Sequence, residues 1–253
     1  MVQSIKQFLD NDHIARMVFQ TPKYSTVDGF LLDIIDGSVF KDHEIFSAFE
    51  TSLQILLYYD DVEICNPLGK KAGTHKIGVF YYSIANMPKL YRSRLPCIRL
   101  LSIVKRKVMN EYGIKHVLER INTDLIEISQ GINIMINGEV KLVKGAVIAF
   151  IGDTLAIHEV CGFKVGVGFA YQKCRECECT PADLQTKFRE DLFLKRNLQS
   201  YDDQCQELDR AVTRGMRNHL SRIYGINERS YARDFPGFNL LTNTPEDIMH
   251  VLF

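Results

Sequence analysis

Carboxylates follow two short apolar segments of this sequence. Asp60 and Asp61 come directly after the strand-forming run 53–59, and Asp153 ends the apolar run that starts at Gly145. Runs of this length predict buried strands, and a buried strand delivers the residues after it to the edge of a sheet, where ligands bind. Because Mg²⁺ and Mn²⁺ prefer oxygen ligands, we expect Asp60 and Asp153 to bind a divalent cation together.

Each of these aspartates also has an ordinary structural interpretation. Strand ends commonly carry Asp, which starts a turn and stays hydrated. Asp153 precedes a predicted helix, 154–161, and is a candidate for its N-cap residue. Capping and metal binding can coexist at Asp153, so the sequence leaves both roles open.

A second set of candidate metal ligands lies further along the chain. Cys174 and Cys177 form a C-x-x-C pair, with Cys179 two residues later. Such a pair supplies half of a tetrahedral Zn²⁺ site, and the best candidate for the other half is Asp247-x-x-His250, because residues three apart on a helix face the same way. A redox pair is the alternative, but the thioredoxin-like βαβ context is missing, so zinc is favoured.

The elements that must position these residues follow a regular order. Three strands come first, then a helix that Gly131 ends, a hairpin at Asn137-Gly138, a further strand and a short helix. The expected ranges are 53–59, 76–84, 97–104, 114–129, 145–153 and 154–161. A strand order with an Asp closing the first and fourth strands is typical of a ribonuclease H-like nucleotidyl-transfer core, in which two divalent metals lie about 3.5–4 Å apart.

The sequence predicts an α/β protein of three parts. Residues 1–50 form an N-terminal arm, with one amphipathic helix in its first twenty residues, that packs on the core. Residues 51–172 form the ribonuclease H-like mixed sheet with its helices. Residues 173–253 form a Cys-rich knuckle and the start of a mostly helical, zinc-associated insertion, with long helices expected at 182–199 and 202–223.

Charge is unevenly distributed although the formal net charge is zero. Residues 1–63 carry eleven acidic and four basic side chains, whereas residues 64–118 carry eleven basic side chains and one acidic one. This segregation favours a polyanion-binding surface beside an acidic site, or else two segments that neutralise each other in the fold. The candidate DNA-binding side chains are Lys70, Lys71, Lys76, Lys105, Arg106 and Lys107.

Several classes of protein are not favoured by the sequence. No apolar run of about 18 residues is present, so no membrane partner is expected. The first residues do not have the pattern of a signal peptide, so we expect an intracellular protein whose seven cysteines are thiols or metal ligands. The P-loop, G-x-S-x-G and H-E-x-x-H patterns are absent, and no small organic cofactor is expected.

Four segments together resemble a known family. They are YYDDVEICNPLGKKAGTHKIGVFYYSIANMPKLYRS, GDTLAIHEVCGF, KCRECECT and TPEDIMHVLF. In this order they are similar to metazoan transposon-derived proteins near the CACTA (En/Spm-like) transposases, over most of the chain from about Asp36 onward. The resemblance implies a nuclear DDE transposase whose ribonuclease H-like core is interrupted by a helical insertion, with DNA at transposon ends as partner and possible homo-oligomers.

The resemblance also implies roles for individual residues. Asp60 matches the first catalytic Asp of the family and Asp153 the second, while Cys174, Cys177, Asp247 and His250 match its C-x-x-C and D-x-x-H pairs. The third acid of the family, a Glu, lies beyond the D-x-x-H pair, whereas this sequence stops at Phe253. We therefore expect a catalytic fragment that is incomplete or inactive alone. The alternative is a non-enzymatic DNA- or protein-binding module that retains the fold and zinc site.

Overall fold

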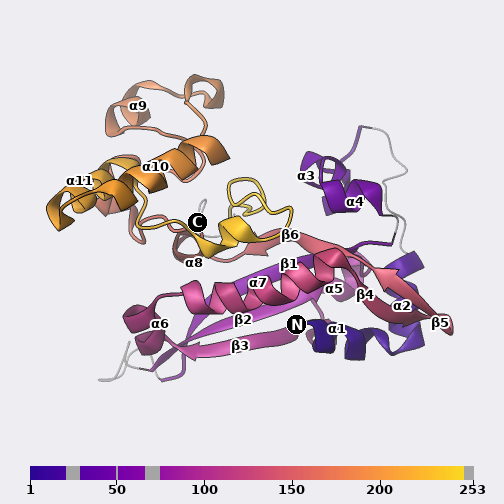
Figure 1. The fold of residues 1–253 in the computed structure, drawn as a ribbon. Helices are drawn as coiled ribbons and strands as arrows, with labels where there is room; N and C mark the ends of the chain where they lie inside the picture. The colour runs from indigo at the N-terminus through magenta and orange to yellow at the C-terminus, as the bar shows by residue number, and fades with distance from the viewer. Residues whose placement is uncertain (21–28, 50, 66–74, 248–253) are drawn as a thin grey trace.

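The computed structural model describes residues 1–20, 29–49, 51–65 and 75–247. Its centre is a mixed four-stranded sheet with the order β3-β2-β1-β6 (Figure 1). The strands are β1 (Leu53–Glu63), β2 (Lys76–Ile84), β3 (Arg99–Lys105) and β6 (Gly145–Ile151). β1 pairs antiparallel with β2 and parallel with β6, and β2 pairs antiparallel with β3. The expected α/β class with a mixed sheet and helices is confirmed.

β1 is buried on both faces over its first half. On one face Ile55 and Leu57 belong to the larger hydrophobic core, and on the other Leu56 packs with Phe40 and Phe46. This two-sided burial explains why the run has no polar alternation before Asp60. β1 continues to Glu63, so Asp60 and Asp61 lie inside the strand rather than after it.

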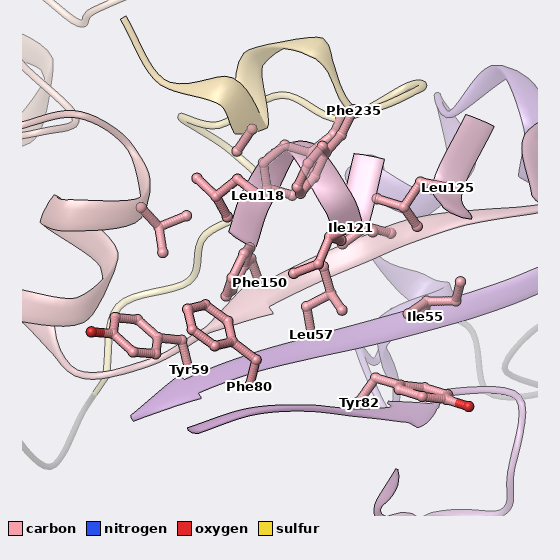
Figure 2. Packing of buried hydrophobic residues seen from close by; sticks show 14 of the residues in the cluster. Ile55, Leu57, Tyr59, Phe80, Tyr82, Leu118, Ile121, Leu125, Phe150 and Phe235 are labelled. Atoms are coloured by element: carbon pink, nitrogen blue, oxygen red, sulfur yellow. The ribbon is translucent and has the colours of Figure 1, made fainter. Parts of the chain in front are cut away.

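The larger core lies between the sheet and α7 (Lys115–Gln130). Figure 2 shows Leu118, Ile121 and Leu125 of α7 above side chains of β1, β2 and β6, with Phe235 joining from the C-terminal part of the chain. The opposite face carries η1 (Ile34–Asp36), α3 (Ser38–Lys41) and α4 (Glu44–Ala48). The sheet is therefore covered by helices on both faces.

The hairpin at Asn137-Gly138 is confirmed, but it forms a separate sheet. β4 (Ile132–Ile136) pairs antiparallel with β5 (Glu139–Val143), and both turn residues have positive φ, 53° and 79°. Asn and Gly tolerate that conformation at low cost, which fixes the turn. The other short elements before β4 are α5 (Lys89–Arg92), η2 (Leu95–Cys97) and α6 (Arg106–Tyr112).

Our prediction of a single helix in the first twenty residues is wrong. The structure has two, α1 (Val2–Leu9) and α2 (Asp12–Gln20). The Asn11 side chain accepts hydrogen bonds from the backbone N–H groups of His13 (3.0 Å) and Ile14 (3.3 Å). These bonds start a new helix, because an Asn that caps backbone donors competes with continuation of the preceding one.

Our prediction of two long helices after residue 181 is also wrong. The structure has α9 (Pro181–Thr186), η4 (Glu190–Leu192), α10 (Leu198–Arg210) and α11 (Arg214–Tyr224). Asn197 and Thr213 each accept a hydrogen bond from a backbone N–H at the start of α10 and α11. Local capping therefore divides the polar run at positions where periodicity alone predicts continuity.

The C-terminal part of the chain returns to the sheet. After η5 (Tyr231–Asp234), Asn243 lies against the outer edge of β6: its carbonyl accepts a hydrogen bond from Phe150 N (2.8 Å), and its side chain donates to Ile148 O (3.0 Å). These bonds satisfy edge groups that would otherwise be unpaired. The same segment contacts the chain that follows α8 (Thr154–Val160) and η3 (Val167–Phe169): Cys161 Sγ lies 3.6 Å from Leu240 O, and Arg175 donates to Thr244 O at 2.6 Å.

Candidate active site at the β1–β6 edge

The parallel pairing of β1 with β6 brings Asp60 and Asp153 to the same end of the sheet. The last paired positions are Tyr58 and Ile151, and each aspartate comes two residues later. The two chains stay close for one more residue after the last pair. A Cβ added at Gly152 would lie only 2.8 Å from Tyr59 O. Neighbouring strands lie about 4.8 Å apart, so the register brings Asp60 of β1 beside the segment that leaves the end of β6.

Strand alternation applies to Asp60, which lies two residues after Tyr58 in β1 and therefore on the face of the smaller core that contains Phe40 and Phe46. Asp153 lies beyond the end of β6, where its side chain caps α8. Asp60 is exposed, and Asp153 is half-buried. The end of the sheet at Asp60 is therefore open to solvent.

The neighbourhood of Asp60 is aromatic. The rings of Tyr58 and Tyr81 stack with centroids 4.9 Å apart on that face. Burial raises the pKa of Tyr81, and the negative charge of Asp60 raises it further. Tyr81 therefore stays a neutral phenol beside the carboxylate and can donate a hydrogen bond, but it cannot serve as an anionic ligand at neutral pH.

Asp153 is the N-cap residue of α8, as the structural interpretation of the sequence predicted. Its Oδ1 accepts a hydrogen bond from the Ala156 backbone N–H at 2.6 Å. The cap orients the carboxylate at the end of β6, since the bond fixes one oxygen against the first turn of the helix. Whether the same carboxylate also binds a metal stays a prediction.

Asp61 belongs to a different cluster on the opposite face. The single Tyr59 hydroxyl proton has two acceptors within reach, Asp61 Oδ1 (3.0 Å) and Glu159 Oε2 (3.2 Å), and Arg106 pairs with Glu159 at 2.6 Å. Burial and the charges of Glu159 and Asp61 raise the pKa of Tyr59. Sequence reasoning missed this cluster, because nothing in the spacing links Arg106 to Glu159.

The candidate DNA-binding residues divide into three groups. Lys70 and Lys71 lie outside the described residues. Lys76 begins β2, and Lys105 and Lys107 stand at the end of β3 and the start of α6; all three are exposed at the end of the sheet where β1 finishes. Arg106 directs its guanidinium into the ion pair with Glu159, so its positive charge is compensated.

The cysteine pair lies in a turn beside the C-terminal segment. The Glu176 backbone N–H donates to Cys174 Sγ at 3.3 Å. Burial raises the pKa of Cys177 to about 12, and the neighbouring Cys174 adds to the shift, so without a metal the thiol stays protonated. A hollow of about 370 Å³ is lined by Cys174 and Cys177 and also by Leu241, Thr242, Thr244 and Pro245.

Arg175 holds the C-terminal segment against this turn. The buried guanidinium donates to Thr244 O at 2.6 Å and pairs with Glu246 at 2.8 Å. Asp247 comes next in the chain, and His250 lies outside the described residues. The segment that leads to Asp247 is therefore held beside the turn with Cys174 and Cys177, and the predicted pairing of C-x-x-C with D-x-x-H stays a prediction.

Within the described ranges, no group of three or more His, Cys, Asp or Glu side chains is arranged to hold a metal ion. All seven cysteines are free. No helix in the described part of the chain has the length and apolar character needed to cross a membrane. No protein-family model matches the chain, and no curated protein matches it.

Proposed function

We propose that this chain carries the catalytic core of a divalent-metal-dependent DNA strand transferase of the DDE type, built on a ribonuclease H-like fold. One observation carries the proposal: β1 and β6 pair in parallel, and Asp60 and Asp153 each follow the paired residues Tyr58 and Ile151 by two positions. The strand order β3-β2-β1-β6, with two antiparallel pairs and one parallel pair, supports the same fold.

In this proposal Asp60 and Asp153 hold Mg²⁺ or Mn²⁺ through carboxylate oxygens. When bound, the metal supplies charge stabilisation for the attacking and leaving oxygens of a phosphodiester. The exposed Asp60 gives the cation access to solvent and DNA, and the hydrogen bond from Ala156 N keeps Asp153 oriented. Lys76, Lys105 and Lys107, at the same end of the sheet, contact DNA phosphates together with Lys70 and Lys71.

The proposal includes a structural zinc ion that joins the knuckle to the C-terminal segment. Cys174 and Cys177 supply two ligands, and Asp247 and His250 supply the other two. The contact of Arg175 with Thr244 and Glu246 supports this assignment, because it brings the approach to Asp247 beside the thiols before any metal binds. Zinc would replace the thiol protons, since only thiolates coordinate it.

A second candidate function is a non-enzymatic nucleic-acid-binding module. It is favoured by one observation: among the residues that the structure describes, no third acid joins Asp60 and Asp153. A DDE site needs that acid for full activity. A chain that binds DNA and zinc but fails to bind Mg²⁺ or Mn²⁺ at the two aspartates would have this function.

Calorimetric titration of the full chain with Mn²⁺ tests the proposal. Asp60→Asn and Asp153→Asn should each weaken Mn²⁺ binding at least tenfold, because each removes a charged ligand. Asn is also a good N-cap residue, so Asp153→Asn should preserve α8. Asp61→Asn, on the opposite face, is the matched control and should bind Mn²⁺ as the unmodified chain does. Equal affinity in all four proteins would refute the assignment.

A further inference from the structure

A basic surface lies on the helical part of the chain, away from the sheet edge described above. Two segments that form it, 160–175 and 210–227, contain no acidic residue. They carry seven basic ones, namely Lys164, Lys173, Arg175, Arg210, Arg214, Arg217 and Arg222. In Figure 1, α11 lies at the outer end of the helical part, beyond α8.

Backbone hydrogen bonds join the two segments into one surface. Tyr171 N donates to Arg222 O (2.7 Å), Gln172 N to Ile223 O (3.1 Å) and Lys164 N to Gly225 O (2.8 Å). The basic side chains of α11 are thereby held beside Lys164. The surface is a fixed feature of the fold, because these are main-chain bonds that do not depend on side-chain rotamers.

Four of these positive charges lack acidic partners in the described part of the chain, whereas the buried Arg175 pairs with Glu246. None of the ion pairs among the described residues includes Lys164, Arg214, Arg217 or Arg222. Burial lowers the pKa of Lys164, and repulsion from Arg222 and Arg217 lowers it further. An anionic ligand would relieve this repulsion, since like charges close together are costly until a counter-charge is bound.

Exposed rings accompany the charges. Phe169 is 73% exposed and Tyr171 is 51% exposed. Both line a hollow of about 350 Å³ whose opposite wall is formed by His219, Arg222 and Ile223 of α11. An exposed phenylalanine beside Arg222, which takes part in none of the ion pairs of the described residues, suits a ligand with flat rings and negative charges, because the rings stack on Phe169 while a phosphate contacts the arginine.

We propose that α11 and the segment around Phe169 bind single-stranded nucleic acid, with a base stacked in the hollow and phosphates on Arg217, Arg222 and Lys164. This surface differs from the group of Lys76, Lys105 and Lys107 that is proposed to contact DNA at the end of the sheet. The inference does not require metal at Asp60 and Asp153, so it holds or fails separately from the proposed strand transfer.

The test is fluorescence anisotropy of a labelled twelve-nucleotide oligo-dT with the full chain, in EDTA so that no divalent metal contributes. Arg217→Gln/Arg222→Gln should weaken binding about tenfold and lower the slope of log affinity against log salt by about 1.4, since each phosphate contact on a single strand contributes about 0.7. Arg222→Gln alone, at an exposed side chain, should weaken it less. A matched double variant, Arg16→Gln/Lys141→Gln, removes the same net charge elsewhere and should bind as the unmodified chain does.

Phe169→Ala separates stacking from charge. It should weaken oligo-dT binding about tenfold and leave binding to the matching duplex nearly unchanged, because only unpaired bases offer a face to the ring. Equal loss in both double variants, or no loss in Arg217→Gln/Arg222→Gln, would overturn the inference. Binding to phosphatidylserine vesicles with no measurable oligo-dT binding would also overturn it, in favour of a lipid surface.

Discussion

At the scale of single residues, burial decides which titratable groups stay neutral. His43 begins α4, and its Nδ1 accepts a hydrogen bond from Ile45 N at 3.2 Å. Its ring stacks on Phe46 with centroids 4.1 Å apart. Burial lowers the pKa of His43, and burial likewise lowers the pKa of His158, whose Nδ1 lies 2.9 Å from Lys164 O.

These histidines should make the fold less stable in mild acid. Because their folded pKa values lie below the ordinary value of 6.5, the unfolded chain binds more protons as pH falls through that value. The free energy of unfolding in urea should therefore be lower at pH 5 than at pH 7. His43→Asn keeps a capping side chain and should reduce this pH dependence, whereas His13→Asn, at an exposed position, should leave it unchanged. A pH dependence unaltered by His43→Asn would contradict this account.

At the scale of elements, α11 is fixed by its C-terminal glycine. Gly225 has φ of +71°, and a Cβ added there would lie 2.2 Å from Gln172 O. Both facts require glycine. The left-handed backbone conformation ends the helix, and the absence of a side chain leaves room for the backbone of Gln172. The helix expected over residues 202–223 ends within one residue of the observed end of α11 at Tyr224. The capping residue Thr213, which divides the expected long helix, was not predicted, because its effect depends on a local hydrogen bond.

Gly225→Ala should destabilise the protein by about 2 kcal/mol or more, measured by urea unfolding, because the substitution adds backbone strain to a steric clash. Gly168→Ala is the matched control in the neighbouring segment. An added Cβ there has no heavy atom within 4 Å, so its effect should stay within about 0.5 kcal/mol. A Gly225→Ala variant as stable as the control would contradict the packing described for α11.

At the scale of the whole molecule, the sheet brings chemistry from distant segments to one end. The apolar runs before Asp60 and Asp153 predicted β1 and β6, because strands buried on both faces leave an unmistakable composition. Sequence reasoning did not find that Asp60 lies inside its strand, that Arg106 pairs with Glu159, or that α11 completes a basic surface. Those features depend on contacts between segments far apart in the chain, which periodicity does not encode.

The most direct test of the proposed function is a crystal structure of the full chain with Mn²⁺, using anomalous scattering to locate the ion. The account predicts an anomalous peak at coordination distance, about 2.1–2.2 Å, from carboxylate oxygens of both Asp60 and Asp153. A peak bound by only one of these residues, or none at this edge of the sheet under saturating Mn²⁺, would contradict it.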